Sequence, residues 1–219
     1  MGTDVEREKQ LAAEAAAALV EDGMTVGLGT GTTAGYFLTA LAARRLDLRC
    51  VATSPATESA ALALGLPLES FDDPNALTRL DLAVDGADQV APDGWIVKGG
   101  GGAHTREKVV AAAADRFVVI ASSDKLVERV AAPVPLELLA FGVAATLDRL
   151  GHARLREAPP TPDGGMLADW LGPVDDPAEL AARLSATPGI VEHGLFAPEL
   201  VSEVLVGSGD GVARTAYGA

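Results

Sequence analysis

The sequence predicts an α/β fold with a doubly wound, mainly parallel sheet and a second, smaller α+β unit. Apolar strand, glycine- or hydroxyl-rich loop and helix recur in that order from Met24 to Lys125, which is typical of βαβ units. Pro133 and Pro135 then break the pattern, and helices and strands follow in a different order. The length also fits, because 219 residues suffice for one large domain and one small one.

The composition indicates a globular protein, with 48% hydrophobic and 22% charged residues. The net charge of −14 disfavours binding to nucleic acid and to anionic membranes. The chain shows no run of eighteen apolar residues and no basic-then-apolar leader, so we expect a soluble, cytoplasmic protein. An acidic surface would also repel a phosphorylated metabolite, so such a ligand would need a local nest of N–H groups, lysines and arginines.

The sequence gives no support for metal chemistry. The three histidines, His104, His152 and His193, are scattered, and no Cys/His spacing of the zinc type occurs. Cys50 is the single cysteine, so it cannot form an internal disulfide, and a reducing compartment is consistent with that. We interpret it as a buried small hydrophobic residue, because it lies in a strand-like run.

The expected elements follow from hydrophobic periodicity and from the turn residues. In the first part we expect helices over 5–22, from the loop at 29–33 to about 43, from the segment after 53–57 through 64, and over 107–114. We expect strands there over 24–28, 49–52, 67–71, 80–84, 95–97 and 116–121. In the second part we expect helices over 136–150 and 180–185, strands over 153–156, 166–170, 189–191 and 201–206, a turn over 207–211 and a frayed end.

The glycine run after the strand at 95–97 is the central motif. Lys98 precedes four consecutive glycines, 99–102, and a helical segment follows. Glycine lets the backbone approach a ligand closely, and the loop N–H groups with a helix N-terminus form an anion site. We expect Thr105 to cap the helix and Glu107 to lie on its first turn. A lysine and a glutamate across such a loop can supply a charge stabiliser and a base.

A second glycine loop follows the first strand. It contains Gly29, Thr30, Gly31, Thr32 and Thr33, and suits a phosphate or a sugar hydroxyl at a helix N-terminus. The run also matches the dinucleotide fingerprint G-x-G-x-x-A, but that site needs an acidic residue about 20 positions on. The next strand ends in Thr53-Ser54 instead, which disfavours NAD or FAD. These two hydroxyls either line the same crevice or form a helix cap and turn.

Two further strand ends carry charged residues. Asp85 and Asp88 flank Gly86 and Ala87 after an apolar strand, and two acids at that edge of a parallel sheet can grip hydroxyls or exchange protons. Lys125 follows the strand at 116–121, in Ser122-Ser-Asp-Lys125.

Together these motifs resemble the A-type ribose-5-phosphate isomerases, nearly from end to end. The resemblance rests on Gly29-Thr-Gly-Thr-Thr33, Asp85-Gly-Ala-Asp88, Lys98-Gly-Gly-Gly101, Thr105-Arg-Glu-Lys108, Ser123-Asp-Lys125 and Pro188-Gly-Ile-Val-Glu-His-Gly-Leu-Phe196. It implies interconversion of D-ribose 5-phosphate and D-ribulose 5-phosphate in the non-oxidative pentose phosphate pathway, without a metal or an organic cofactor. It also implies a homodimer or homotetramer, a Rossmann-like catalytic domain over 1–131 with 200–219, and a small inserted α+β domain over 132–199 for oligomerisation.

The resemblance also assigns roles to residues. Glu107 matches the catalytic base, with Asp85, Asp88 and Lys98 as further catalytic groups. The substrate-binding positions that it implies are Thr30, Gly31, Thr32, Thr33, Asp85, Gly86, Ala87, Asp88, Lys98, Gly99, Gly100, Gly101, Lys125 and Lys9, the last an N-terminal lysine that could reach the phosphate.

The chain departs from the family pattern at Gln89, Gly102 and His104. His104 stands where a leucine is common, and it could tune Glu107 or face away from it. These departures leave room for a shifted sugar preference. Two other functions stay open at this point, a non-catalytic sugar-phosphate sensor and a CoA-transferase-like enzyme with a glutamate acyl acceptor.

Overall fold

The computed structural model describes residues 2–73, 75–209 and 211–217. The chain divides into two compact units, each described here by itself. The first contains Met1–Ala87, Arg106–Leu126 and Pro198–Ala219, and the second contains Asp88–Thr105 and Val127–Ala197. In the described part of the chain, no helix is long and apolar enough to cross a membrane.

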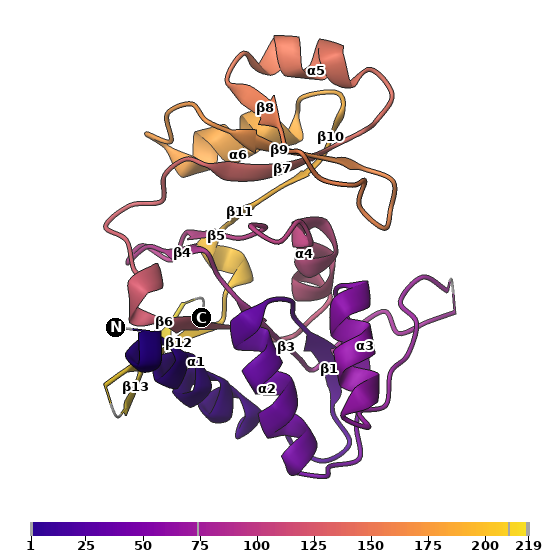
Figure 1. Ribbon diagram of the computed structural model, residues 1–219, viewed down its shortest axis with the longest axis vertical. Helices are drawn as coiled ribbons and strands as arrows, with labels where there is room; N and C mark the ends of the chain where they lie inside the picture. The colour runs from indigo at the N-terminus through magenta and orange to yellow at the C-terminus, as the bar shows by residue number, and fades with distance from the viewer. Residues whose placement is uncertain (1, 74, 210, 218–219) are drawn as a thin grey trace. The chain divides into compact units, whose positions relative to one another are not determined.

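The first unit is built on a six-stranded sheet in the order β13-β12-β6-β3-β1-β2 (Figure 1). Its strands are β1 (Thr25–Leu28), β2 (Arg49–Ala52), β3 (Leu82–Gly86), β6 (Phe117–Ser122), β12 (Glu203–Ser208) and β13 (Gly211–Ala216). All neighbouring strands are parallel except β12 and β13, which form an antiparallel hairpin. A mainly parallel sheet needs helices on its faces, so its strands read as almost continuous apolar runs.

Helices α1 (Gly2–Ala17), α2 (Thr32–Ala43) and α3 (Pro55–Ala63) belong to this unit. Small alanines on α1, such as Ala13 and Ala16, pack in one core cluster with Phe37 of α2 and the strand residues. Cys50 of β2 is fully buried in the same cluster. Its burial confirms the prediction from the sequence. Burial also disfavours the thiolate and raises the pKa of Cys50 to about 12, so the thiol is inert.

The second unit contains two small antiparallel sheets. One has the order β10-β7-β9-β8 and the other β11-β5-β4. Their elements are β4 (Gln89–Val90), β5 (Ile96–Val97), β7 (Val134–Leu138), β8 (Ala153–Leu155), β9 (Met166–Trp170), β10 (Ile190–His193) and β11 (Leu195–Phe196), with helices α5 (Val143–Leu150) and α6 (Pro177–Ser185). Leu136, Leu138, Trp170 and Leu184 form the centre of its core.

Helix α4 (His104–Ala112) begins in the second unit and continues in the first. Its later residue Val110 packs so closely on Gly27 of β1 that a side chain at position 27 would overlap it. Two short 3-10 helices, η1 (Ser123–Lys125) and η2 (Pro198–Leu200), complete the elements described in the first unit.

The predicted α/β fold class is confirmed, but two of the expected elements are wrong and one strand was not predicted. The expected helix over 136–150 is the buried strand β7 followed by α5, and Gly142 has a left-handed backbone (φ 74°) between them. The expected strand over 67–71 is reduced to one bridge between Leu68 and Cys50. The expected turn over 207–211 is confirmed, because Gly209 forms the turn between β12 and β13. Strand β13 was not predicted, and its register with β12 runs from Glu203 to Ala216. The expected frayed end falls partly on residues 218–219, which lie outside the described residues.

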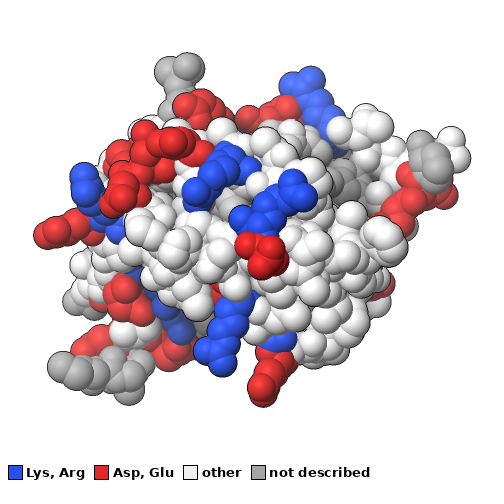
Figure 2. All heavy atoms as spheres, turned by 90° about the horizontal axis from the view of Figure 1, so that it is seen from above, with Lys and Arg blue, Asp and Glu red and all other residues white. Residues whose placement is uncertain are grey.

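Charged side chains of both signs share the face shown in Figure 2, and acidic ones crowd part of its rim. This agrees with the net charge of −14. Local arrangement, rather than overall charge, must therefore hold any anionic ligand.

Candidate active site

The carboxyl ends of four neighbouring parallel strands carry most of the predicted site residues of the first unit; Glu107 and Lys9 lie on helices instead. Gly29–Thr33 follow β1, Thr53 and Ser54 follow β2, Asp85 and Gly86 end β3, and Lys125 follows β6 in η1. Because parallel strands end at the same edge of a sheet, these loops share one edge, where ligands bind in open α/β sheets.

Asp85 is held rigidly at this edge. Its side chain is 2% exposed, and Oδ1 accepts hydrogen bonds from the N–H groups of Thr30 (3.0 Å) and Gly86 (2.7 Å). A side chain at Gly29 would overlap the Asp85 carboxyl group, so only glycine allows β1 and β3 this approach. Gly29 thus leaves the space that the Asp85 carboxylate occupies.

The Thr30 hydroxyl lies in a cluster of hydroxyls that joins the ends of β1 and β2. Its oxygen is 2.8 Å from Thr53 Oγ1, 2.8 Å from Ser54 Oγ and 3.0 Å from Thr57 Oγ1. Ser54 also caps α3, because its oxygen accepts from the Thr57 N–H at 3.1 Å. The cap that the sequence suggested at this point is therefore present, and the Thr30 hydroxyl serves the fold.

The start of α2 leaves polar groups accessible. Gly31 precedes the helix in a backbone conformation that favours glycine (φ 111°), and it is exposed together with Thr32. Thr33 is half-buried on the same turn. The first N–H groups of a helix lack intrahelical partners, so this turn can bind an anion.

Lys125 lies in η1, which is tied to α1 by a residue that sequence reasoning missed. The Glu8 carboxylate accepts from the Ser123 N–H (2.8 Å) and the Ser123 hydroxyl (2.7 Å). These two bonds hold the pKa of Glu8 below its usual value, and the bond from the Ser123 hydroxyl has the larger effect. Lys125 Nζ is 3.3 Å from Asp124, whereas Lys9 Nζ on α1 binds Glu6 at 2.6 Å.

Glu107 lies in the first turn of α4 and is only 5% exposed. The expected capping role of Thr105 is wrong, because the helix begins one residue earlier, at His104. The Thr105 hydroxyl donates instead to Glu137 of β7, which is 2% exposed and also accepts from Thr161 at 2.6 Å. Glu137 was not predicted, because only the fold brings it to the start of the helix.

In the second unit, the glycine loop is held from several directions. Lys98 is 3% exposed, its N–H donates to the Gly194 carbonyl at 2.9 Å, and its Nζ lies 5.6 Å from the Phe196 ring centroid. Gly100 donates its N–H to Asp88 Oδ2 at 2.7 Å. This binding of Asp88 to the loop joins two motifs that the sequence shows only separately.

His104 packs against the glycine loop. It is fully buried, and a Cβ at Gly99 (φ 102°) would lie 2.6 Å from its Nδ1. Gly102 (φ 80°) packs likewise on Leu167, because a Cβ at position 102 would lie 2.5 Å from Leu167 Cδ1. Both departures from the family pattern therefore shape the loop through close packing.

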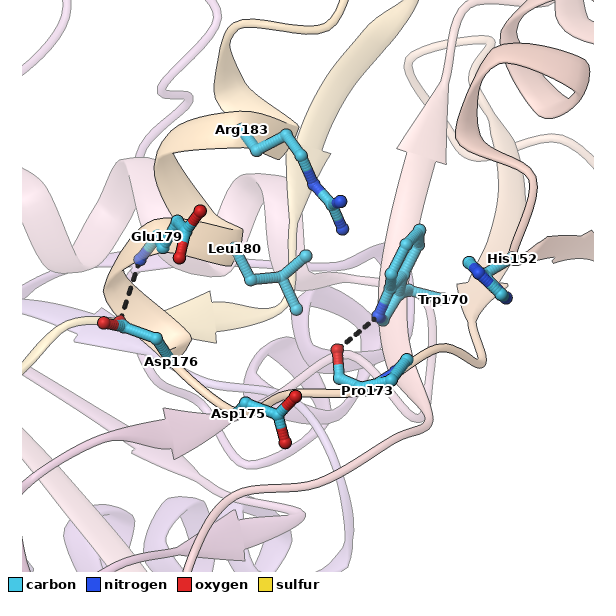
Figure 3. A pocket seen from close by; sticks show the side chains of 8 residues that line it. All are labelled: His152, Trp170, Pro173, Asp175, Asp176, Glu179, Leu180 and Arg183. Atoms are coloured by element: carbon cyan, nitrogen blue, oxygen red, sulfur yellow. Dashed lines mark hydrogen bonds between the residues drawn. The ribbon is translucent and has the colours of Figure 1, made fainter.

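A pocket of about 230 Å³ lies elsewhere in the second unit (Figure 3). It is lined by His152, Trp170, Pro173, Asp175, Asp176, Glu179, Leu180 and Arg183. Its polar groups serve the fold: Asp176 caps α6, Trp170 Nε1 donates to Pro173 at 3.2 Å, and the Arg183 guanidinium covers the Trp170 ring at 4.7 Å. The sequence-predicted site residues do not line this pocket.

Comparison with known proteins identifies relatives over nearly the whole chain. The sequence model of ribose 5-phosphate isomerase A (phosphoriboisomerase A) matches residues 49–211. The ribose-5-phosphate isomerase A of Caulobacter vibrioides is 45% identical, over 94% of this chain and 96% of its own. Among solved structures, that of ribose 5-phosphate isomerase A from Methanocaldococcus jannaschii has a TM-score of 0.88 at 33% identity, covering 95% of this chain and 97% of its own. A D-ribose-5-phosphate isomerase in complex with phospho-erythronic acid has a TM-score of 0.89 at 33% identity, covering 97% and 99%.

Proposed function

This chain belongs to the ribose 5-phosphate isomerase A family, and from that premise we propose how its residues interconvert D-ribose 5-phosphate and D-ribulose 5-phosphate. The observation that carries the proposal is the burial of three charged groups, since Asp85, Lys98 and Glu107 are 2%, 3% and 5% exposed. Burying a charge costs free energy unless it is compensated, so buried charged groups are concentrated at functional sites.

We propose that Glu107 is the base. Aldose–ketose isomerisation moves a proton between C2 and C1 through a cis-enediolate, and one carboxylate can remove the proton from one carbon and return it to the other. Glu107 lies on the first turn of α4, so the helix fixes the position of its backbone. General acid–base catalysis of this kind contributes about 10²–10⁴-fold.

The enediolate develops negative charge on oxygen, which preorganised donors must stabilise. Lys98 and the N–H groups of Gly99 and Gly101 are the donors that we propose for this role, while the Gly100 N–H donates to Asp88 and keeps the loop in place. The anchored Lys98 backbone supports the assignment, because a donor that is already oriented has little to reorganise during the reaction.

Asp85 and Asp88 are proposed to handle the hydroxyl protons. They either shuttle a proton between O1 and O2 or help to open the furanose ring, because the enzyme must act on the open chain. Gly86 and Ala87 connect them and are proposed to contact the sugar through their backbone.

The phosphate is proposed to bind at the sheet edge of the first unit. The accessible first turn of α2, with Gly31, Thr32 and Thr33, offers N–H groups and hydroxyls, and Lys125 adds a positive charge. Thr30 is proposed to take part by holding the loop in place, since its hydroxyl is engaged with Thr53 and Ser54 and its N–H donates to Asp85. Lys9 is a further candidate for the same anion, and its partner in the structure is Glu6. Charge-assisted bonds of this type let an acidic protein hold an anionic sugar.

This mechanism uses no metal and no organic cofactor, because carboxylates, an ammonium group and N–H groups supply every proton transfer and all charge stabilisation. We further propose a cytoplasmic homodimer or homotetramer. The catalytic function would lie in 1–131 with 200–219 and the oligomer contacts in 132–199, where Leu139 and Phe141 are 52% and 94% exposed.

The test is an isomerase assay with ribose 5-phosphate in the presence of EDTA, comparing wild type with Glu107→Gln. We expect turnover that survives EDTA and falls by about 10²–10⁴-fold in the variant, which keeps its affinity for phospho-erythronic acid. Glu58→Gln is the matched control, because Glu58 is an exposed carboxylate on the first turn of α3. Near wild-type turnover of Glu107→Gln would exclude Glu107 as the base. An inactive wild type would shift attention to other sugar phosphates.

A further inference from the structure

We propose that Arg156 is a positioning residue that holds the glycine loop in its working geometry, and this inference rests on the function proposed above. Arg156 follows β8, and its Nη1 donates to the carbonyl oxygens of Gly99 (2.9 Å) and Gly100 (3.1 Å). Two consecutive loop carbonyls are thereby directed at one guanidinium group.

The guanidinium is itself fixed by Asp169 on β9. Nε and Nη2 of Arg156 bind the two carboxylate oxygens at 3.0 Å and 2.6 Å, which is a bidentate pair. The two side chains are 19% and 23% exposed, so water competes little for these bonds. Leu167 of the same strand accepts the Arg156 N–H at 2.9 Å. Strand β9 therefore fixes both the guanidinium group and the backbone of Arg156.

The carbonyl contacts orient the donors of the loop. In a trans peptide the carbonyl and the N–H of one plane point in opposite directions. The Gly99–Gly100 plane is held on one side by Arg156 and on the other by Asp88, which accepts the Gly100 N–H at 2.7 Å. The next plane has its carbonyl on Arg156, which turns the Gly101 N–H away from the guanidinium. Arg156 thus acts through Asp88 and the Gly101 N–H, two of the groups proposed to meet the substrate.

Only an arginine can do this. The guanidinium presents donors on three sides in a rigid plane, whereas a lysine ammonium is a single point with flexible reach. Lysine at this position could bind Asp169 or the loop carbonyls but could not span both with the same geometry. Arg156→Lys therefore keeps the charge and removes the positioning.

The chain provides a matched control in Arg154. It lies two residues earlier on the same face, its Cα pairs with Asp169 across the sheet, and it is exposed. Arg154→Lys makes the same arginine-to-lysine change two residues away, on β8, and leaves the contacts of Arg156 with the glycine loop in place.

The experiment compares wild type, Arg156→Lys, Asp169→Asn and Arg154→Lys in steady-state kinetics with ribose 5-phosphate. We expect kcat to fall by about 10- to 100-fold in Arg156→Lys, since misplacing catalytic groups by about 1 Å costs up to about 10²-fold. KM should change by less than about threefold, because the proposed phosphate site lies in the other unit. A variant that lost only uniform binding of substrate and transition state would instead raise KM and leave kcat unchanged. Asp169→Asn should show a smaller loss of kcat, and Arg154→Lys should match wild type.

Amide hydrogen exchange gives a readout that does not depend on the reaction. We expect faster exchange across Gly99–Gly102 in Arg156→Lys and unchanged exchange there in Arg154→Lys, with all variants folded by circular dichroism. An Arg156→Lys protein with wild-type kcat or unchanged loop exchange would overturn the proposal. An inactive wild type would defeat the proposed function instead, and the loop exchange would still decide the role of Arg156.

Discussion

At the scale of single residues, the candidate site depends on glycines that make room for charged groups. Gly29 allows the Asp85 carboxylate to sit against the end of β1, and Gly99 allows His104 to pack under the loop. The sequence shows these glycines and suggests close backbone approach, but it does not say what approaches. The partner in each case is a side chain of the protein, and a ligand is not needed to explain either residue.

We predict that Gly29→Ala will displace Asp85 and lower kcat/KM by about 10- to 100-fold, because the new methyl group overlaps the carboxylate. The matched control is Gly35→Ala on α2, where an added Cβ has open space. That change should leave activity intact and stabilise the protein by about 0.5–1 kcal/mol, measured by urea unfolding. Wild-type kinetics for Gly29→Ala would contradict the proposed role of the Asp85 position.

Some functional candidates lay beyond sequence reasoning for a physical reason. Arg156 is 57 positions from Gly99, and Glu8 is 115 positions from Ser123. Neither side chain belongs to a local motif, so only the folded chain reveals its partner. The acids and glycines at strand ends could be predicted because parallel strands bring their carboxyl ends together whatever the separation along the chain.

At the scale of elements, predictions succeeded where turn residues bounded short apolar runs. Strands β2 and β9 have the expected bounds, 49–52 and 166–170. The prediction for 136–150 is wrong because the apolar spacing fits a helix throughout, while Leu136 and Leu138 are buried in β7, an inner strand of a four-stranded sheet. Tertiary pairing, which the local pattern does not contain, decided that case.

The contact between α1 and η1 predicts a pH dependence of stability. The folded-state pKa of Glu8 is lowered by Ser123, so the stabilisation is complete above the ordinary pKa of 4.5 and is lost as the pH falls through the folded value. Thermal unfolding followed from pH 7 to pH 3 should show Glu8→Gln losing less stability than wild type on acidification. Glu14→Gln on the same helix serves as the control. Parallel pH profiles for wild type and Glu8→Gln would show that this contact does not contribute.

At the scale of the whole molecule, net charge and local charge oppose each other. The chain carries −14, yet the proposed ligand is an anion. Long-range repulsion is screened by salt over about 10 Å at 0.1 M, whereas contacts at a helix N-terminus are short-range. Binding must therefore depend on the few donors at the sheet edge and in the glycine loop.

Phe141, beside Leu139, is the residue with which we test the proposed oligomer. A phenylalanine that is 94% exposed is costly in water, so burial against another copy of the chain would stabilise an assembly. We predict that light scattering will show a dimer or tetramer for wild type and a smaller species for Phe141→Ser. Leu62→Ser, at an exposed leucine of the first unit, should keep the wild-type mass. An unchanged mass for Phe141→Ser would exclude this surface from the contact.

The inert Cys50 gives the chain a built-in reporter of its own opening. Because this thiol is fully buried in β2 and is the single cysteine, a thiol-labelling reagent can react only after that edge of the large sheet has opened. The labelling rate of the native protein therefore measures how often the larger unit opens. The smaller unit has no cysteine, so its separate unfolding would leave the signal silent unless the larger unit opens with it.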